Sequence, residues 1–312
     1  MSTLTDKSIL KTTRRITVGK VIASLRLFAL PISLLSVPMA TAAVLPPSRW
    51  HWGVLVAATA VVSLLHLAGN LLNDFFDFGS RVDTADDEED SCRPGRLLVR
   101  GALLPRDVLT EAIVCLILAN IFGGYLLWKC GFSLLWFALV GVAGLYAYSA
   151  PPFNLKHRAL GELTMFVVFG PALGLCAAFA QTGRLEPAAL WISFVPGFAT
   201  AATLSGNNFR DREEDGRAGI RTLALFGCGK IVRIAYFALV FGAVAVPVVL
   251  AVIGKGPMLL LAAPLLMFML GRPFACMWKG HRLPDIDART ARFETALLLL
   301  ILAAYVIWPP SP

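Results

Sequence analysis

Two groups of amide and carboxylate side chains end apolar segments of this sequence, where they could bind a metal ion and an anion. The first group contains Asn70, Asn73, Asp74 and Asp77, and Asp83 follows it. At about 100° per residue, helical spacing brings the first four side chains within an arc of roughly 100°. One face of the predicted helix therefore carries all four polar groups.

The second group repeats this composition at the end of a later apolar segment. It contains Asn207, Asn208, Asp211 and Asp215, and its two acids lie one helical turn apart. An uncompensated Asp inside a bilayer costs roughly 2.5 to 3.5 kcal/mol, and carboxylates crowded on one helix face repel each other. A cation held between the carboxylates would remove both penalties.

Magnesium is the cation that suits these groups. It prefers oxygen ligands, keeps several waters and commonly joins one or two carboxylates to substrate phosphates. Arginines at and after the second group could bind the remaining phosphate oxygens; they are Arg210, Arg212, Arg217 and Arg221. Each cluster alone could be a solvated helix end beside a basic loop, but the presence of two favours a magnesium and diphosphate site.

Long apolar segments must position these groups, because the composition is that of a membrane protein. Of the 312 residues, 57% are hydrophobic and 15% are charged, with a mean hydropathy of +0.71, whereas soluble chains carry about 25% charged residues. Many apolar stretches have the length of a membrane-spanning helix, and the alternating segments of a β-barrel are not seen. A soluble domain is therefore excluded.

We expect an all-α polytopic membrane protein, a bundle of nine helices with a central cavity that opens at the cytoplasmic side. Residues 1–20 would be a cytoplasmic tail, and 21–312 a single nine-helix domain. The expected spans are about 22–44, 52–77, 108–128, 132–149, 159–180, 188–209, 228–254, 257–277 and 291–308.

The basic residues predict the orientation of these spans. With the N-terminus inside, only Arg49, Lys129, Arg184 and Lys255 fall outside, as the positive-inside rule requires. The net charge of +8 is thereby explained without nucleic acid. The six cysteines are too widely spaced for a zinc site or a redox pair. We expect the N-terminus and the loops after both polar groups to lie in the cytoplasm. We expect the protein itself to lie in a bacterial inner membrane.

These motifs resemble the UbiA superfamily of intramembrane aromatic prenyltransferases, whose plan is nine helices with Asp-rich motifs after the second and sixth. The nearest resemblance is to the menaquinone branch, the 1,4-dihydroxy-2-naphthoate polyprenyltransferases. The matching runs are Asn73-Asp74-Phe-Phe-Asp77-Phe-Gly-Ser-Arg-Val-Asp83-Thr84, Asn207-Asn208-Phe-Arg210-Asp211-Arg-Glu-Glu-Asp215, Gly219-Ile-Arg221-Thr222, Tyr148-Ser-Ala-Pro-Pro and Leu160-Gly161-Glu162. The chain departs from the branch at Gly79, Arg81, Ala150, Pro151 and Ile220.

The resemblance implies Mg²⁺-dependent transfer of a polyprenyl group from polyprenyl diphosphate to an aromatic acceptor within the lipid bilayer. In this branch the acceptor is 1,4-dihydroxy-2-naphthoate, which loses its carboxylate as CO₂. The implied catalytic residues are Asp77, Asp211, Asp74 and Asp215, which with Asp83 would be the metal ligands. The implied substrate-binding residues are Asn70, Asn73, Lys156, Asn207, Asn208, Arg210 and Arg221.

Several alternatives stay open at this point. The same chemistry could act on 4-hydroxybenzoate, homogentisate or a porphyrin-type alcohol. Acidic residues within the membrane could also belong to a cation-coupled transporter, which is the less favoured interpretation. Lys156 could bind diphosphate or only set the topology, and His66 is expected to pack rather than to contact the acceptor. The acidic run 86–90 is expected to be a solvated loop. Prenyl chain length and oligomeric state are not predicted.

Overall fold

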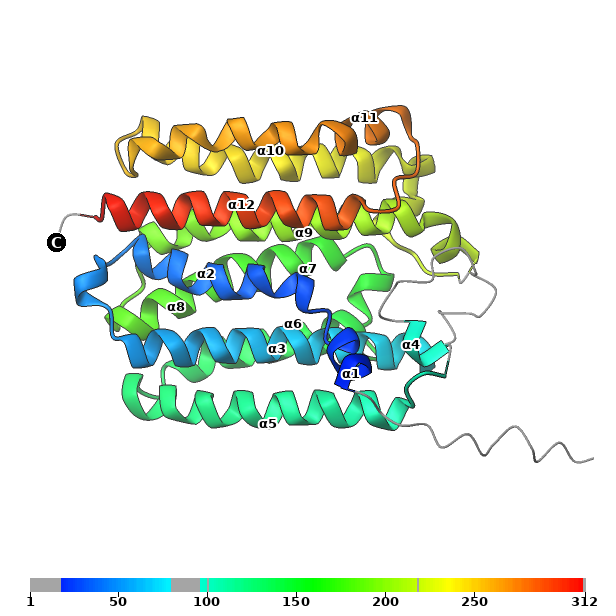
Figure 1. Ribbon diagram of the computed structural model, residues 1–312, viewed down its shortest axis with the longest axis horizontal. Helices are drawn as coiled ribbons and strands as arrows, with labels where there is room; N and C mark the ends of the chain where they lie inside the picture. The colour runs from blue at the N-terminus through cyan, green and yellow to red at the C-terminus, as the bar shows by residue number, and fades with distance from the viewer. Residues whose placement is uncertain (1–17, 80–95, 100, 218, 311–312) are drawn as a thin grey trace, which may run out of the picture.

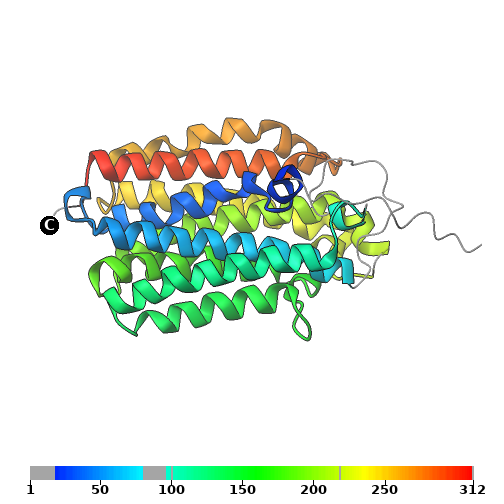
Figure 2. The same ribbon diagram turned by 60° about the horizontal axis from the view of Figure 1, so that its bottom comes forward.

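The computed structural model describes residues 18–79, 96–99, 101–217 and 219–310, and these form an all-helical bundle without β-strands (Figures 1 and 2). The α-helices are α1 (Val18–Ser24), α2 (Leu30–Ala42), α3 (Trp52–Gly79), α4 (Arg96–Val99), α5 (Pro105–Cys130), α6 (Leu134–Ser149), α7 (Gly161–Val167), α8 (Leu173–Thr182), α9 (Pro187–Arg217), α10 (Lys230–Val252), α11 (Gly271–Lys279) and α12 (Ile286–Ile307). The shorter helical segments are η1 (Leu27–Ala29), η2 (Pro47–Arg49), η3 (Leu155–His157), η4 (Val168–Ala172), η5 (Leu223–Gly229) and η6 (Met258–Leu270).

The described residues contain seven helical stretches that are long and apolar enough to cross a membrane. These are Trp52–Gly79, Pro105–Cys130, Gly161–Thr182, Pro187–Arg217, Leu223–Val252, Met258–Lys279 and Ile286–Ile307. The other two predicted spans, 22–44 and 132–149, contain the shorter apolar helices α2 and α6, of 13 and 16 residues. The all-α membrane fold is confirmed.

The first predicted span is broken near its start. Arg26 adopts a left-handed backbone conformation, with φ 50°, between α1 and η1. A non-glycine residue in that conformation cannot continue a right-handed helix. The helix that crosses the bundle therefore begins only at Leu30, and Arg26 is left at its end.

Helix α9 is the most buried of the seven long stretches. Its residues Ala199, Ala201 and Ala202 are fully buried, and a Cβ atom added to Gly197 would lie only 2.7 Å from the carbonyl oxygen of Phe166. Small residues let helix backbones approach closely in a membrane protein. Many large side chains on the outer helices are exposed instead, such as Phe268 on η6 at 79%, and this outward apolar surface suits contact with lipid.

The topology brings the two polar groups to one end of the bundle. Helices α3 and α9 both end there and α12 begins there (Figures 1 and 2). We call it the acidic end, defined by the last turns of α3 and α9. A backbone hydrogen bond of 3.2 Å, from the Arg221 N–H to the His157 carbonyl oxygen, joins the segments that follow α6 and α9.

Candidate active site

The first polar group holds a lysine from the segment after α6. The Lys156 ammonium donates to Asn73 Oδ1 and Asp77 Oδ1, each at 2.5 Å, and the amide of Asn73 donates to Asp77 Oδ2 at 3.0 Å. Ser149 donates to the same oxygen of Asn73 at 3.0 Å, and His157 Nε2 lies 3.6 Å from Asp77 Oδ1. Lys156 is thus a direct partner of the first group, and its side chain is 10% exposed.

Asp74 has a different cation. It forms an ion pair with Arg26, and the Asp74 side chain is only 5% exposed. The sequence analysis missed Arg26, which precedes Asp74 by 48 residues. The only signal for it is that Arg26 is a basic residue at the start of an apolar span, where the positive-inside rule already explains its charge.

In the second polar group, Arg210 binds several carboxylates and carbonyls at once. Its guanidinium donates to both carboxylate oxygens of Asp211, at 2.8 and 2.9 Å, and to Asn207 Oδ1. It also pairs with Asp287 of α12 at 2.6 Å and donates to the Pro284 carbonyl at 3.3 Å. Arg210, predicted to bind substrate, therefore links α9 to the start of α12, a role that the sequence analysis did not foresee.

Asp215 and Arg221 lie where α9 ends. Asp215 Oδ2 accepts a hydrogen bond of 3.2 Å from the Thr222 hydroxyl, and its carbonyl accepts from the Ile220 N–H at 3.0 Å. The Arg221 side chain is exposed, while its backbone pairs with the segment that carries Lys156. These bonds fold the chain after α9 back toward the first polar group.

The remaining predicted amides differ in how they are paired. Asn208 is 8% exposed and donates to Glu162 Oε1 at 2.9 Å. The Nδ2 atom of Asn70 is buried and has no hydrogen-bond partner among the described residues. His66 shares a 2.7 Å hydrogen bond with Ser33 and packs edge-on against Phe169, in agreement with the packing role expected for it.

The two polar groups lie near each other at the acidic end. The side chains of Asp77, Asp215 and Glu162 all interact electrostatically with the Tyr148 phenol, and Asp77 and Asp215 interact with each other. Carboxylates of α3, α7 and α9 therefore lie near one tyrosine of α6. Anionic and cationic side chains gathered in this way can bind a metal ion together with an anionic substrate.

The donor set suits Mg²⁺. Among the described residues no three His, Cys, Asp or Glu side chains form a ready-made metal cage. Magnesium does not need such a cage, because it usually takes one or two carboxylates and completes its shell with water and substrate phosphates. The paired acids of α3 and α9 supply such carboxylates. Asp83, Arg81 and the acidic run 86–90 lie outside the described residues.

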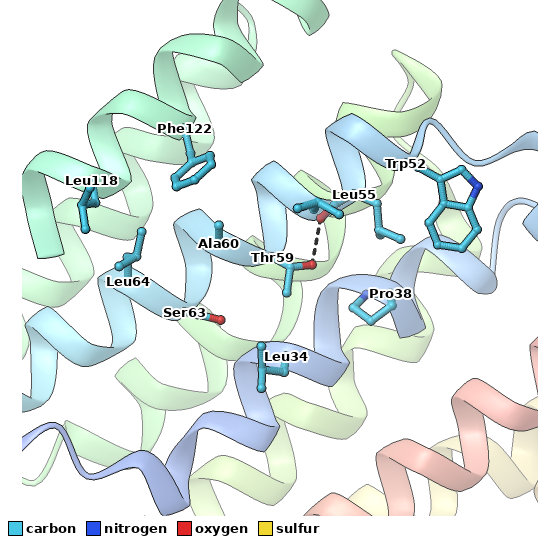
Figure 3. Close-up of a pocket in the computed structure, with 11 residues that line it drawn as sticks. Leu34, Pro38, Trp52, Leu55, Thr59, Ala60, Ser63, Leu64, Leu118 and Phe122 are labelled. Carbon is cyan, nitrogen blue, oxygen red and sulfur yellow. Dashed lines mark hydrogen bonds between the residues drawn. The ribbon is translucent and has the colours of Figure 1, made fainter. Parts of the chain in front are cut away.

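An apolar cavity of about 520 Å³, open at the surface of the bundle where Trp52 and Val56 are exposed, lies along the first half of α3, away from the acidic end (Figure 3). Its lining comes from α2, α3 and α5 and includes Leu34, Ala60, Ser63 and Phe122. Ser63, Asn70 and Asp77 are seven residues apart, so their side chains lie within about 40° of one another around α3. The cavity therefore follows the helix face that carries the first polar group.

The comparisons with known proteins agree with this architecture. A model of the UbiA prenyltransferase family matches residues 29–301. The 1,4-dihydroxy-2-naphthoate octaprenyltransferase of Bacillus subtilis (strain 168) is 31% identical over 164 residues, which span 52% of this chain and 50% of that protein. The UbiA prenyltransferase domain-containing protein 1 of Homo sapiens is 28% identical over 260 residues, 82% of this chain and 74% of that protein.

A solved structure gives the same fold. The structure of a UbiA homolog from Archaeoglobus fulgidus bound to GPP and Mg²⁺ matches with a TM-score of 0.65 and 18% identity, covering 92% of this chain and 99% of that one. At this identity the likeness concerns the fold. Because the family model matches residues 29–301 of this chain, the chain belongs to the UbiA prenyltransferase family.

Proposed function

We propose that this membrane prenyltransferase transfers a polyprenyl group from polyprenyl diphosphate to an aromatic acceptor, with Mg²⁺ as cofactor. One observation carries the proposal: helices α3 and α9 finish at the same end of the bundle with carboxylate pairs, and each pair has a cationic side chain within hydrogen-bond distance. Carboxylates alone would repel a diphosphate. Carboxylates with a divalent cation and with Lys and Arg would bind one.

We assign the metal to Asp74, Asp77, Asp83, Asp211 and Asp215. Bound there, Mg²⁺ would supply Lewis-acid stabilisation of the diphosphate as the allylic C–O bond ionises. Lys156, Arg210 and Arg221 would bind the remaining phosphate oxygens, and the amides of Asn70, Asn73, Asn207 and Asn208 would orient the substrate. No protein nucleophile is needed, because the electron-rich ring attacks the allylic carbon.

The membrane contributes to this chemistry. Both the polyprenyl tail and the product are lipids, and the site must exclude water, which would otherwise capture an allylic cation. We propose that the acidic end faces the cytoplasm of a bacterial cell with the protein in its inner membrane, and that residues 21–312 act as a single domain after a short tail. Soluble substrates would then reach the site from the cytoplasm.

We propose 1,4-dihydroxy-2-naphthoate as the acceptor, with loss of its carboxylate, as in menaquinone biosynthesis. The Bacillus subtilis relative that carries this activity in its name supports the choice, although the match spans half of that protein. The relatives matched over more of this chain are named only for their domain. Another aromatic acceptor is therefore the alternative.

Carboxyl-labelled 1,4-dihydroxy-2-naphthoate tests the acceptor. Purified protein in detergent or vesicles is incubated with it, a polyprenyl diphosphate and Mg²⁺, and the lipid product is identified by mass. We expect one labelled CO₂ for each prenyl group transferred, and no product from the Asp77→Ala variant. Prenylation of 4-hydroxybenzoate instead, with the carboxylate retained, would contradict the naphthoate assignment and leave the prenyltransferase chemistry in place.

A further inference from the structure

We propose that Glu162 binds a hydroxyl group of the aromatic acceptor through its Oε2 atom. The proposal rests on the prenyltransferase function argued above and adds to it the residue that distinguishes the acceptor from the diphosphate. Glu162 belongs to a sequence motif that the metal and diphosphate assignments leave without a role.

The two carboxylate oxygens of Glu162 differ in their surroundings. Oε1 accepts hydrogen bonds from Asn208 at 2.9 Å and from Ser205 at 3.5 Å. Oε2 is buried and has no partner among the described residues. The whole residue is 7% exposed. Buried carboxylate oxygens are almost always hydrogen-bonded, so Oε2 is expected to have a donor that the described part of the chain does not provide.

Glu162 lies in the first turn of α7, at the edge of the site. A Cβ atom added to the adjacent Gly161 would lie 3.3 Å from the Lys156 Cα and 3.6 Å from Tyr148. Glu162 and Asp77 both interact electrostatically with Tyr148, and Asn208 ties Glu162 to the second polar group. Oε2 is therefore a buried acceptor without a partner among the described residues, and it belongs to a side chain that lies beside both polar groups.

The chemistry of a carboxylate oxygen selects its ligand. A diphosphate offers only negatively charged acceptor oxygens, and a carboxylate would repel it. The carboxyl group of an aromatic acid would be repelled in the same way. A ring hydroxyl can donate a hydrogen bond to Oε2, and a charged acceptor makes this bond stronger than a neutral one would. The ligand that fits is thus a hydroxylated ring, with its hydroxyl rather than its carboxylate toward Glu162.

Glu294 provides a matched control. It is another carboxyl in the bundle, on α12, and it is fully buried. Its Oε1 accepts from Thr200 at 2.7 Å and its Oε2 from Thr203 at 3.3 Å. Both of its oxygens are therefore satisfied within the chain, so a Glu294→Gln variant changes a buried carboxyl without removing a free acceptor.

The experiment compares Glu162→Gln with Glu294→Gln in the purified enzyme. For Glu162→Gln we expect the KM for the aromatic acceptor to rise at least tenfold, with unchanged KM for polyprenyl diphosphate and unchanged Mg²⁺ dependence. Binding of the acceptor without Mg²⁺ or diphosphate, followed by tryptophan fluorescence, should weaken by a similar factor. Glu294→Gln should leave the KM for the acceptor unchanged.

An acceptor analogue with its ring hydroxyl methylated gives a second test, whose first arm uses only the wild-type enzyme. The wild-type enzyme should use the methyl ether at least tenfold less well than the parent compound, because the donor is gone. Glu162→Gln should discriminate much less between the two. Equal use of both by the wild type, or an altered Mg²⁺ dependence in Glu162→Gln, would overturn the proposal. Failure of the wild type to prenylate any aromatic acceptor would instead overturn the proposed function.

Discussion

Lys156 shows how one residue connects two segments of the site. Its ammonium contacts Asn73 and Asp77 of α3, although it comes from η3, after α6. In the resting protein it balances the charge of Asp77. If a diphosphate and its metal ion bind as proposed, the same ammonium would be available to bind a phosphate oxygen, because Lys is a compact charge on a flexible stem.

Replacing Lys156 by Ala should therefore lower kcat/KM for polyprenyl diphosphate by about ten- to a hundredfold, the effect of losing one hydrogen bond to a charged group. Arg158→Ala is the control, since Arg158 is an exposed cation of the same loop whose guanidinium donates to the Pro152 carbonyl. Steady-state kinetics at saturating acceptor measure both variants. Equal effects of the two substitutions would mean that Lys156 acts only through the general positive charge of the loop.

The aspartates give the second prediction at this scale. Asp77→Ala or Asp211→Ala should abolish turnover in a protein that still folds, and substitution of Asp74, Asp83 or Asp215 should lower it by orders of magnitude. EDTA should abolish the wild-type activity and Mg²⁺ should restore it, because in the proposed mechanism the carboxylates act through the metal.

Asp285→Ala is the control for the aspartate series. Asp285 lies at the acidic end too, but its side chain is 46% exposed and pairs with Arg289. It should retain near-normal turnover. Full activity in EDTA, or near-normal turnover by the Asp77 and Asp211 variants in excess Mg²⁺, would show that both polar groups are structural.

At the scale of helices, periodicity and length predicted most of the architecture. A bilayer demands long apolar segments, so the sequence shows where helices such as α3 and α9 run, and 100° spacing shows that Asp74 and Asp77 share a face. The break at Arg26 was not predictable, because nothing local marks a left-handed residue there. The pairs Arg26–Asp74 and Glu162–Asn208 were not predictable either, since they depend on which helices pack together.

The cavity along α3 leads to a prediction about the length of the polyprenyl group that the enzyme can use. Ala60 lines it, about 25 Å from Asp77 at 1.5 Å per residue, and we expect the far part of a long polyprenyl tail to lie there (Figure 3). Ala60→Trp should fill the space and lower kcat/KM for long polyprenyl diphosphates at least tenfold, while geranyl diphosphate, which is too short to reach it, is used normally.

Ala143→Trp is the control for this substitution, because Ala143 is an exposed residue of α6 and a Trp there meets lipid. Competition between a short and a long diphosphate in one reaction, read by product mass, measures the ratio directly. An unchanged ratio in Ala60→Trp would show that the tail runs elsewhere in the bundle.

At the scale of the whole molecule, the distribution of basic residues and the helix topology indicate the same orientation in the membrane. The carboxylate groups of α3 and α9 lie at the same end of the bundle as the Lys156 segment and the start of α12. From the positive-inside rule we propose that this end faces the cytoplasm. The other end carries few cations, among them Lys255, which is exposed in the turn after α10.

Cysteine labelling in intact cells tests the orientation. Cys228 is exposed at the acidic end, so a variant that keeps it as the only cysteine should react with a membrane-impermeant maleimide only after the cells are permeabilised. Lys255→Cys in a cysteine-free background should react in intact cells, because the proposed orientation places its end of the bundle outside. Labelling of Cys228 in intact cells would contradict the proposed orientation. The soluble substrates would then have to reach the site from the other side of the membrane.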